Sequence, residues 1–314
     1  NALKVAMDWK VQKNFAKGHK EEKGFKVIHF EKAFHGRTGY TLSLTNTLPD
    51  KTKWFAKFDW PRVSTPQIKF PLNEENLKLA KGTEATSIAQ IKQAFAENKD
   101  DICAIIIEPI QSEGGDNHIR EEFLIQLKQL ADENEAFLIY DEVQTGVGLT
   151  GKFWCHQHFS EKARPAITAF GKKMQLGNKV EEVETNVFKV PSRINSTWGG
   201  NLVDMVRSTQ ILNIINEDKL CVNAATVGEH LKNRLQELAN KHDKMYNVRG
   251  RGLLCSFDFT SKEMRDTFIK KGMEHNAMFL GCGNQTIRFR PALCIEKQHI
   301  DEGMEIIDKI LPTL

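Results

Sequence analysis

Hydrophobic and polar residues follow two recurring patterns along the chain. Short runs of apolar, often β-branched residues are typical of buried strands, and longer stretches with an apolar residue at every third or fourth position are typical of helices. Over the first two thirds of the chain, strand candidates at 27–30, 102–108, 136–140 and 167–170 alternate with helix candidates at 73–98 and 121–135. This alternation predicts βαβ units, and therefore an α/β domain with a mainly parallel sheet.

The last third of the chain has a different order of elements. Two helix candidates come first, and they are followed by strands at 253–259, 277–280 and 286–289 and by helices at 261–275 and 298–311. The two leading helices are 201–216 and 220–240. This order predicts a small α+β domain. We therefore expect a large domain at residues 1–217 and a C-terminal domain at residues 218–314.

The beginning of the sequence has the pattern of a helix interior. Residues 1–10 have apolar positions at helical spacing, with neither an initiator methionine nor an N-cap residue. We expect that an N-terminal segment is missing from this sequence, so the lack of a targeting signal carries little weight.

Composition and charge disfavour several classes of protein. The chain of 314 residues has 44 basic and 41 acidic side chains, and a net charge of +3 does not favour nucleic-acid binding. No apolar run approaches the ~18 residues that a membrane span needs. The six cysteines are scattered without a CxxC pair, which predicts reduced thiols in a cytoplasmic protein and no metal site. His156 and His158 lack the accompanying Cys or Asp ligands of a metal cluster.

Three of the predicted strands end in residues that can carry chemistry: Glu108, Asp141 and Lys172. Ligands bind beyond the carboxyl ends of parallel strands, so these side chains are expected to face one crevice. A lysine that forms a Schiff base and a carboxylate that keeps a pyridine nitrogen protonated would suit pyridoxal phosphate. The alternative is a purely structural role, in which the carboxylates cap helices or stabilise turns and both Lys172 and Lys173 are exposed to solvent.

The residues around these strand ends favour the cofactor hypothesis. Asp141 opens a glycine-rich loop, as close approach of a backbone to a ligand requires. Phe34 and Arg37 place an aromatic face beside a guanidinium, and His35 between them is expected to support their loop. Arg288 and Arg290 fall on one side of a predicted strand, where they could bind carboxylates or form a structural ion pair.

Taken together and in this order, these segments resemble the class III (ω-amino) pyridoxal-phosphate aminotransferases, which have fold type I. The resemblance rests on residues 33–40, 108–118, 141–154, 170–173, 195–198, 248–252 and 287–291. Within the family the chain is most similar to the members that act on the ε-amino group of L-lysine, on residues 34–47, 57–62 and 190–201. The members that act on 4-aminobutyrate are the runner-up, because they share 108–118 and 287–291.

The resemblance implies a cofactor site. Lys172 would hold pyridoxal 5′-phosphate covalently and later move a proton. The adjacent Lys173 is the alternative residue for these two roles. Asp141 would bind the pyridine nitrogen, and Gln144 would bind near the phenolic oxygen. Two further residues, Val143 and Phe34, would pack on the two faces of the ring. Thr197, with Ser196, would reach the phosphate of the neighbouring subunit's cofactor, so the resemblance implies a homodimer.

The resemblance also implies a substrate site. Arg37 would bind the α-carboxylate of lysine, and Arg288 would bind the α-carboxylate of 2-oxoglutarate. Glu113 would neutralise Arg288 while an amine occupies that place. The implied reaction converts L-lysine and 2-oxoglutarate into 2-aminoadipate 6-semialdehyde and L-glutamate. Because the family's N-terminal phosphate-binding turn is absent from this sequence, a non-catalytic relative or a fragment is the alternative of a different class.

Overall fold

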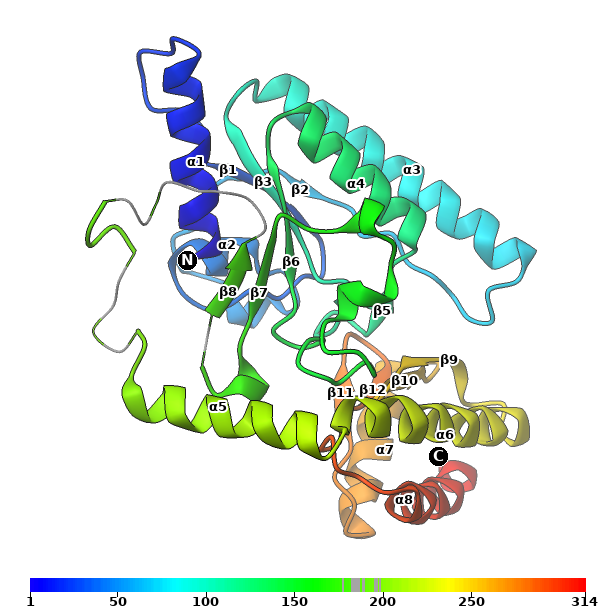
Figure 1. Cartoon of the computed structure of the whole chain (residues 1–314). Helices are drawn as coiled ribbons and strands as arrows, with labels where there is room; N and C mark the ends of the chain where they lie inside the picture. The colour runs from blue at the N-terminus through cyan, green and yellow to red at the C-terminus, as the bar shows by residue number, and fades with distance from the viewer. Residues whose placement is uncertain (177, 182–186, 188–189, 195–196, 198) are drawn as a thin grey trace.

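A six-stranded sheet lies at the centre of the larger part of the molecule (Figure 1). The computed structural model describes residues 1–314 apart from 177, 182–186, 188–189, 195–196 and 198. The strand order is β2-β1-β3-β6-β7-β8. The bounds are β1 (Lys26–Phe30), β2 (Arg62–Val63), β3 (Ile102–Ile107), β6 (Phe137–Asp141), β7 (Ile167–Phe170) and β8 (Asn178–Glu181). All neighbouring pairs are parallel except β7–β8, so the predicted mainly parallel sheet is confirmed.

Both faces of this sheet are covered by helices, which explains why β3 is apolar throughout. All six residues of β3 are buried, and successive side chains point to opposite faces. Ile105 and Ile107 belong to a core shared with α3 (Glu74–Glu97) and α4 (Glu121–Glu133). Ala104 and Ile106 belong to a second core shared with α1 (Ala2–Ala16).

The helices begin and end where their local sequence dictates. The side chain of Asn73 accepts a hydrogen bond from the backbone of Asn76 (2.9 Å), which caps the first turn of α3. In α4 the buried positions include Phe123, Leu124 and Leu127, the spacing of one helix face. The predicted helices at 73–98 and 121–135 are therefore confirmed to within two residues at each end.

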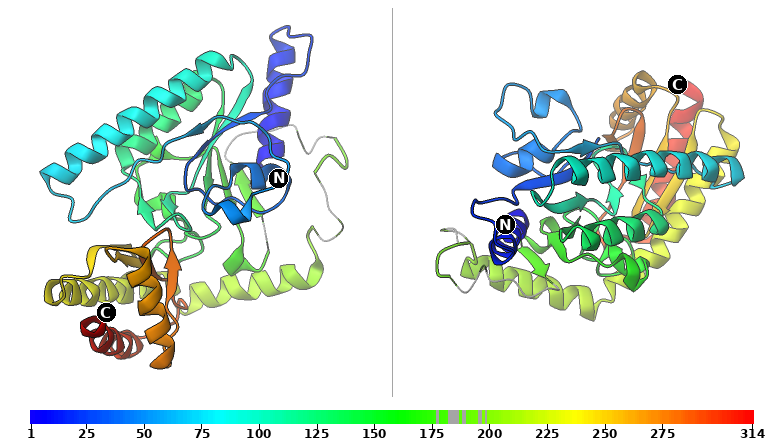
Figure 2. Two further views of the ribbon diagram at one scale, coloured as in Figure 1. Left: turned by 180° about the vertical axis from the view of Figure 1, so that it is seen from behind. Right: turned by 90° about the horizontal axis from the view of Figure 1, so that it is seen from above.

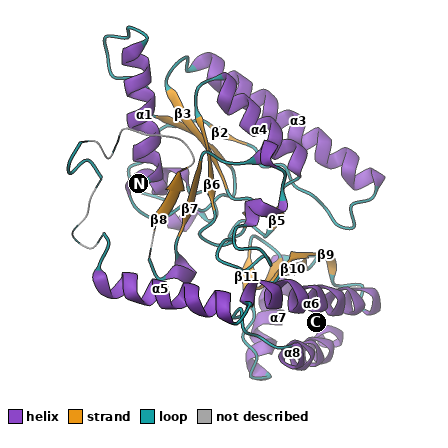
Figure 3. Cartoon of the chain, in the orientation of Figure 1, coloured by secondary structure: helices purple, strands orange, loops and turns teal. Residues whose placement is uncertain are grey.

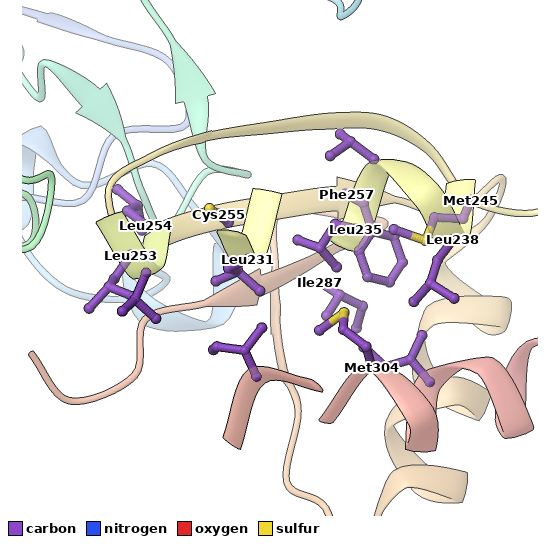
Figure 4. Packing of buried hydrophobic residues seen from close by; sticks show 14 of the residues in the cluster. Leu231, Leu235, Leu238, Met245, Leu253, Leu254, Cys255, Phe257, Ile287 and Met304 are labelled. Carbon is purple, nitrogen blue, oxygen red and sulfur yellow. The ribbon is translucent and has the colours of Figure 1, made fainter. Parts of the chain in front are cut away.

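The C-terminal part of the chain contains a four-stranded antiparallel sheet of order β11-β12-β10-β9. Its strands are β9 (Tyr246–Arg251), β10 (Leu254–Asp258), β11 (Leu280–Cys282) and β12 (Thr286–Phe289). The helices α6 (Leu220–Lys241), α7 (Lys262–Glu274) and α8 (Lys297–Ile310) accompany this sheet. Figure 4 shows Leu231 and Leu235 of α6 packed with Phe257, Ile287 and Met304 in one apolar core.

Helix α5 (Leu202–Glu217) runs from the region below the central sheet to the C-terminal part, where it contacts α6 (Figures 2 and 3). The predicted domain boundary after residue 217 falls between α5 and α6, and it stays a prediction. Ile110 and Leu149 reach into the C-terminal core, so the two parts also share apolar contacts.

Two strands of the C-terminal sheet differ from the sequence prediction. The strand expected at 277–280 is wrong, because the Ala277 amide still closes the end of α7 by donating to Gly272 O (2.8 Å), and β11 begins at Leu280. Strand β9 was not predicted, because its sequence is polar. Arg249 is nevertheless buried in β9, where it forms an ion pair with Asp258.

Several short elements complete the fold. They are α2 (Gly39–Leu44), β4 (Ile110–Gln111), β5 (Asn117–His118), and 3-10 turns at Pro49–Lys51, Cys155–His158, Glu161–Ala163, Lys172–Met174 and Leu311–Thr313. Within the described part of the chain, no helix combines the length and apolarity that a membrane crossing needs.

Candidate active site

The candidate site lies at the carboxyl edge of the central sheet. Strands β1, β3, β6 and β7 run in the same direction, so the residues that follow them lie along one edge. This topology brings together Phe34 after β1, Glu108 after β3, Asp141 at the end of β6 and Lys172 after β7. The expectation that Glu108, Asp141 and Lys172 share one edge is therefore confirmed, and Phe34 joins them there.

Asp141 is held by two hydrogen bonds. Its Oδ2 lies 2.8 Å from His35 Nδ1, and its Oδ1 accepts from the backbone amide of Val143 at 3.0 Å. The His35 side chain is 1% exposed. Burial alone would lower the pKa of His35, but the hydrogen bond to Asp141 and the charges of Asp141 and Glu108 outweigh burial and raise it.

Glu108 joins the same cluster from β3. Its two carboxyl oxygens accept from the backbone amides of Phe34 (3.0 Å) and Ser112 (2.9 Å). Burial raises the pKa of Glu108 to about 7, although His35 acts in the opposite direction. Glu108 therefore fixes the loop that carries Phe34, and it lies near the point of losing its charge at neutral pH.

Lys172 and Lys173 are adjacent but differ in their surroundings. Lys173 Nζ donates to the backbone carbonyls of Gln144 (2.9 Å) and Gly146 (3.0 Å), and burial lowers the pKa of Lys173 to about 8. The side chain of Lys172 forms no hydrogen bond or ion pair with any described residue. Lys173 is thus tied to the loop after β6, and the amine of Lys172 remains available for chemistry.

Lys172 has an unusual backbone and a perturbed amine. Its φ of 42° lies in the left-handed region, which a lysine rarely adopts. Protein packed around the amine lowers the pKa of Lys172, helped by Arg290 and Arg288 and opposed by Glu113 and Asp141. The charges of these four residues therefore act on the Lys172 amine, although the residues come from three different segments of the sequence.

Gln144 lies in the loop after β6. Its Oε1 accepts from Arg290 Nη1 at 3.3 Å, and its Nε2 is buried without a partner among the described residues. On the other side of the site, Arg37 is exposed and its Cζ lies 5.7 Å from the centre of the Phe34 ring. Val143 is half-buried beside Asp141.

Arg288 is buried and is held mainly by Asp116. Its Nε donates to Asp116 Oδ1 at 2.8 Å, and its side chain is 3% exposed. Arg249 positions Asp116 in turn, because its guanidinium donates to the backbone carbonyls of Asp116 and Gly115. Burial raises the pKa of Asp116 to about 6, against the charges of Arg288 and Arg249. The structural ion pair that the sequence left open for Arg288 is thus present.

Glu113 is near Arg288 but has a closer partner. Its Oε1 lies 3.9 Å from Arg288 Nη1, and its Oε2 lies 2.9 Å from Lys51 Nζ. The predicted pairing of Glu113 with Arg288 therefore involves a third residue, Lys51, that the sequence analysis did not select.

The glycines that follow Asp141 have a packing reason. A Cβ on Gly151, whose φ is +90°, would lie 2.9 Å from Ala225 Cβ of α6. A Cβ on Gly148 would lie 3.1 Å from Leu293 Cδ1. These two glycines allow the loop to contact the C-terminal part of the protein, whereas the sequence analysis explained them by the approach of a ligand.

Thr197 is not joined to this cluster. Its side chain is exposed and makes no contact with Lys172 or Asp141 among the described residues. Ser196, the other residue expected to reach the phosphate, lies outside the described residues. The histidines dismissed as metal ligands have ordinary partners, since His156 Nδ1 lies 2.7 Å from Glu142 Oε1 and His158 Nε2 lies 3.0 Å from Thr150 O. The described residues contain no cluster of three or more potential metal ligands.

Two residues of the site, Asp116 and Lys51, were not selected from the sequence, and for Glu108 the sequence did not predict its support of Phe34. Glu108 and Asp116 stand in segments that resemble the family, so their position in those motifs was the available signal. For Lys51 the sequence holds no local signal, because the residue lies 62 positions from Glu113.

Comparisons with known proteins identify the family of the chain. The sequence pattern of the family described as "Aminotransferase class-III" matches residues 1–311. The chain belongs to the class III aminotransferases. This membership confirms the family, the fold and the aminotransferase class that the sequence motifs indicated.

Members of this family with known names are similar over the whole chain. The "L-lysine-epsilon aminotransferase" of Mycobacterium tuberculosis is 44% identical over 320 residues, which cover 100% of this chain and 70% of that protein. The solved structure "Lysine aminotransferase from M. tuberculosis in the internal aldimine form" has a TM-score of 0.95 and 43% identity, and covers 100% of this chain and 72% of that one. The mitochondrial "4-aminobutyrate aminotransferase" of Sus scrofa is 35% identical, over 91% of this chain and 58% of that protein.

Pyridoxal 5′-phosphate is the cofactor of class III aminotransferases, and this family membership confirms the cofactor prediction. The described residues fit such a group in three respects. The site contains the Lys172 amine, which forms no hydrogen bond with any described residue, and the Asp141 carboxylate, which is fixed by two hydrogen bonds. It also contains a buried amide donor, Gln144 Nε2, that has no acceptor among the described residues and that an oxygen of a bound group would satisfy.

Proposed function

We propose that this protein transfers the ε-amino group of L-lysine to 2-oxoglutarate, giving 2-aminoadipate 6-semialdehyde and L-glutamate. The observation that carries the proposal is the 44% identity, over the whole chain, to an L-lysine-epsilon aminotransferase. The 4-aminobutyrate alternative has weaker support, because its relative is 35% identical and is matched over 58% of its length.

Five described residues would hold the cofactor. Lys172 would bind it covalently, Asp141 would accept a hydrogen bond from its ring nitrogen, and Gln144 would donate to its ring oxygen. Val143 and Phe34 would pack on the two faces of its ring. When bound, pyridoxal phosphate supplies an electron sink for bond breaking at the carbon that carries the amino group. The support for these roles is the common edge of the sheet on which the residues lie.

Lys172 would also move the proton. A general base must be neutral to accept a proton, and the lowered pKa of Lys172 increases its neutral fraction. Its Nζ would take the proton from the ε-carbon of lysine and release it again in the same reaction cycle. Lys173 is unsuited to this role, because its Nζ already donates to two backbone carbonyls.

Two arginines would orient the substrates. Arg37, beside the Phe34 ring, would bind the α-carboxylate of lysine and the distal carboxylate of 2-oxoglutarate. Arg288 would bind the α-carboxylate of the oxoacid. Glu113 would neutralise Arg288 in the lysine half-reaction, since an unpaired guanidinium would repel an amine and attract the wrong end of the amino acid.

The proposed homodimer is tested by mixing two inactive variants. If Thr197, with Ser196, serves the phosphate of the neighbouring subunit, a Lys172→Ala subunit paired with a Thr197→Ala subunit contains one complete site. Activity should then return on mixing and subunit exchange. If Thr197 acts within its own subunit, both sites of the mixed dimer lack a residue and no activity returns.

A cytoplasmic location is part of the same proposal. Its support is the state of the six cysteines, which are all free, with four of them buried. Isolated buried thiols are usual for a reducing compartment. Fractionation of the cells that express the full-length protein tests the location.

The main test follows the absorbance of the bound cofactor when amino donors are added without an oxoacid. The proposal predicts that L-lysine bleaches the band and 4-aminobutyrate does not. The reverse result would assign the protein to the 4-aminobutyrate alternative with the same mechanism. A full-length protein that shows no cofactor band would instead be a non-catalytic relative.

A further inference from the structure

Lys51 is a mostly buried cation that contacts Glu113 and lies over the Phe34 ring. Its Nζ lies 2.9 Å from Glu113 Oε2 and donates to Thr47 Oγ1 at 3.1 Å. The Lys51 side chain is 14% exposed, and its Nζ lies 4.9 Å from the centre of the Phe34 ring. Lys51 therefore borders the proposed cofactor and substrate sites without having a role in the proposed chemistry.

Glu113 lies between two positive charges. Its Oε2 contacts Lys51, and its Oε1 is 3.9 Å from Arg288 Nη1. Partial burial raises the pKa of Glu113, but the hydrogen bond and charge of Lys51, together with Arg288, outweigh burial and lower it. Glu113 is thus an anion shared unequally between two cations, and in this structure Lys51 is the closer one.

Arg288 keeps a free donor in this arrangement. Its Nε is taken by Asp116 at 2.8 Å, whereas its Nη2 is buried and has no acceptor among the described residues. Asp116 therefore fixes the guanidinium without using all of its donors. With Glu113 on Lys51, the Nη atoms of Arg288 can donate hydrogen bonds to a bound carboxylate.

We propose that Lys51 determines specificity by holding Glu113 away from Arg288. The α-carboxylate of a dicarboxylic oxoacid can then bind to Arg288, while its distal carboxylate binds to Arg37. When an amine occupies the site, Glu113 moves the short distance back to Arg288. The inference rests on the proposed function, because it assigns Lys51 to the step in which the oxoacid binds. Without Lys51, Glu113 stays with Arg288 and competes with the incoming carboxylate.

The test is calorimetric binding of two unreactive acids to the full-length protein loaded with pyridoxal phosphate. Glutarate has both carboxylates of 2-oxoglutarate, and valerate has one. The Lys51→Met variant should bind glutarate about tenfold more weakly, the usual size of coupling between charged groups in contact, and bind valerate unchanged. Lys51→Arg should restore glutarate binding. The matched control is Lys53→Met, since Lys53 is exposed and pairs with Asp50.

A double variant separates an action through Glu113 from direct binding. In Glu113→Gln the competing anion is gone, so glutarate should bind at least as tightly as to the unaltered protein, and adding Lys51→Met should change nothing further. The single variant Glu113→Gln also keeps the test decisive if Lys51→Met does not fold. Weaker glutarate binding by Glu113→Gln than by the unaltered protein would overturn the inference.

Two further results would overturn the inference about Lys51 and leave the proposed function unaffected. One is tight glutarate binding by folded Lys51→Met, and the other is an equal loss of glutarate and valerate, which would make Lys51 a direct ligand of the first carboxylate. An unaltered protein that binds glutarate no better than valerate would overturn the proposed function as well.

Discussion

His35 Nδ1 lies 2.8 Å from Asp141 Oδ2 and connects the loop after β1 to the end of β6. Strand β3 separates these two strands in the sheet, so the contact spans the middle of the candidate site. Asp141 also accepts from the Val143 amide, and the His35 ring is almost completely buried. His35 is therefore a positioning residue for the carboxylate that we expect to bind the ring nitrogen of the cofactor.

The His35→Phe variant should bind pyridoxal phosphate more weakly. A hydrogen bond to a charged group contributes about 1.5–3 kcal/mol, so its loss should weaken cofactor binding by roughly 10- to 100-fold. His35→Asn should recover part of the affinity, because an amide nitrogen can replace Nδ1 as the donor. Titration of the cofactor-free protein with pyridoxal phosphate measures both effects. Equal affinity of the Phe variant and the unaltered protein would contradict the positioning role.

Glu108 should make stability depend on pH. Burial raises its pKa to about 7 from an ordinary value of 4.5, so its contribution to stability is complete below pH 4.5 and is lost as the pH rises toward 7. Relative to Glu108→Gln, the unaltered protein should lose up to about 3 kcal/mol between pH ~5 and ~8. Urea unfolding of both proteins across this range measures the difference. Parallel pH profiles would show that Glu108 is not perturbed.

Lys172 and Lys173 should respond differently to replacement. Lys172→Ala should abolish both turnover and covalent attachment of the cofactor, which borohydride reduction followed by peptide mass analysis detects. Lys173→Ala should retain the attachment and lower the free energy of unfolding by about 1–3 kcal/mol, because two backbone carbonyls lose a charged donor. Attachment at residue 173, or wild-type activity of Lys172→Ala, would reverse the assignment.

Arg37 should act on substrate binding more than on the chemical step. Arg37→Ala removes a charged partner of the lysine α-carboxylate, so the KM for L-lysine should rise roughly 10- to 100-fold with a smaller change in kcat. Arg37→Lys keeps the charge but not the bidentate geometry. Its KM for L-lysine should lie between those of the unaltered protein and Arg37→Ala. If the KM for L-lysine did not change, the proposed orientation of the substrate would be wrong.

The sequence was sufficient for the parts of the fold that rest on local pattern. The strands β3, β6 and β7 are continuous apolar runs, and their order with α4 is enough to place Glu108, Asp141 and Lys172 at one edge of the sheet. Strand β9 escaped prediction because burial of its Arg249 depends on an ion pair with Asp258, which no periodicity reveals.

The electrostatic part of the site could not be predicted in the same way. Asp116 and Arg288 are 172 positions apart, and Lys51 and Glu113 are 62 apart. Asp116 reaches its partner from a turn with a φ of 47°. Such pairs depend on how turns place individual side chains, whereas hydrophobic patterns specify only faces and strand ends.

Gly228 should tolerate no side chain, although it lies in the middle of helix α6. A Cβ at this position would lie 2.1 Å from the backbone C and O of Gly252, which itself contacts the loop at Thr150. Gly228→Ala should therefore destabilise the protein by about 1–3 kcal/mol through overpacking, against the helix preference of about 1 kcal/mol for alanine.

The matched control is Gly82 in helix α3, where a Cβ would meet no atom within 4 Å. Gly82→Ala should therefore stabilise the protein by up to about 1 kcal/mol. Denaturant unfolding of the two variants compares helix propensity with and without the close contact to Gly252. If both replacements raised the free energy of unfolding, helix propensity would dominate, and the close packing of α6 on the turn at Gly252 would not limit stability.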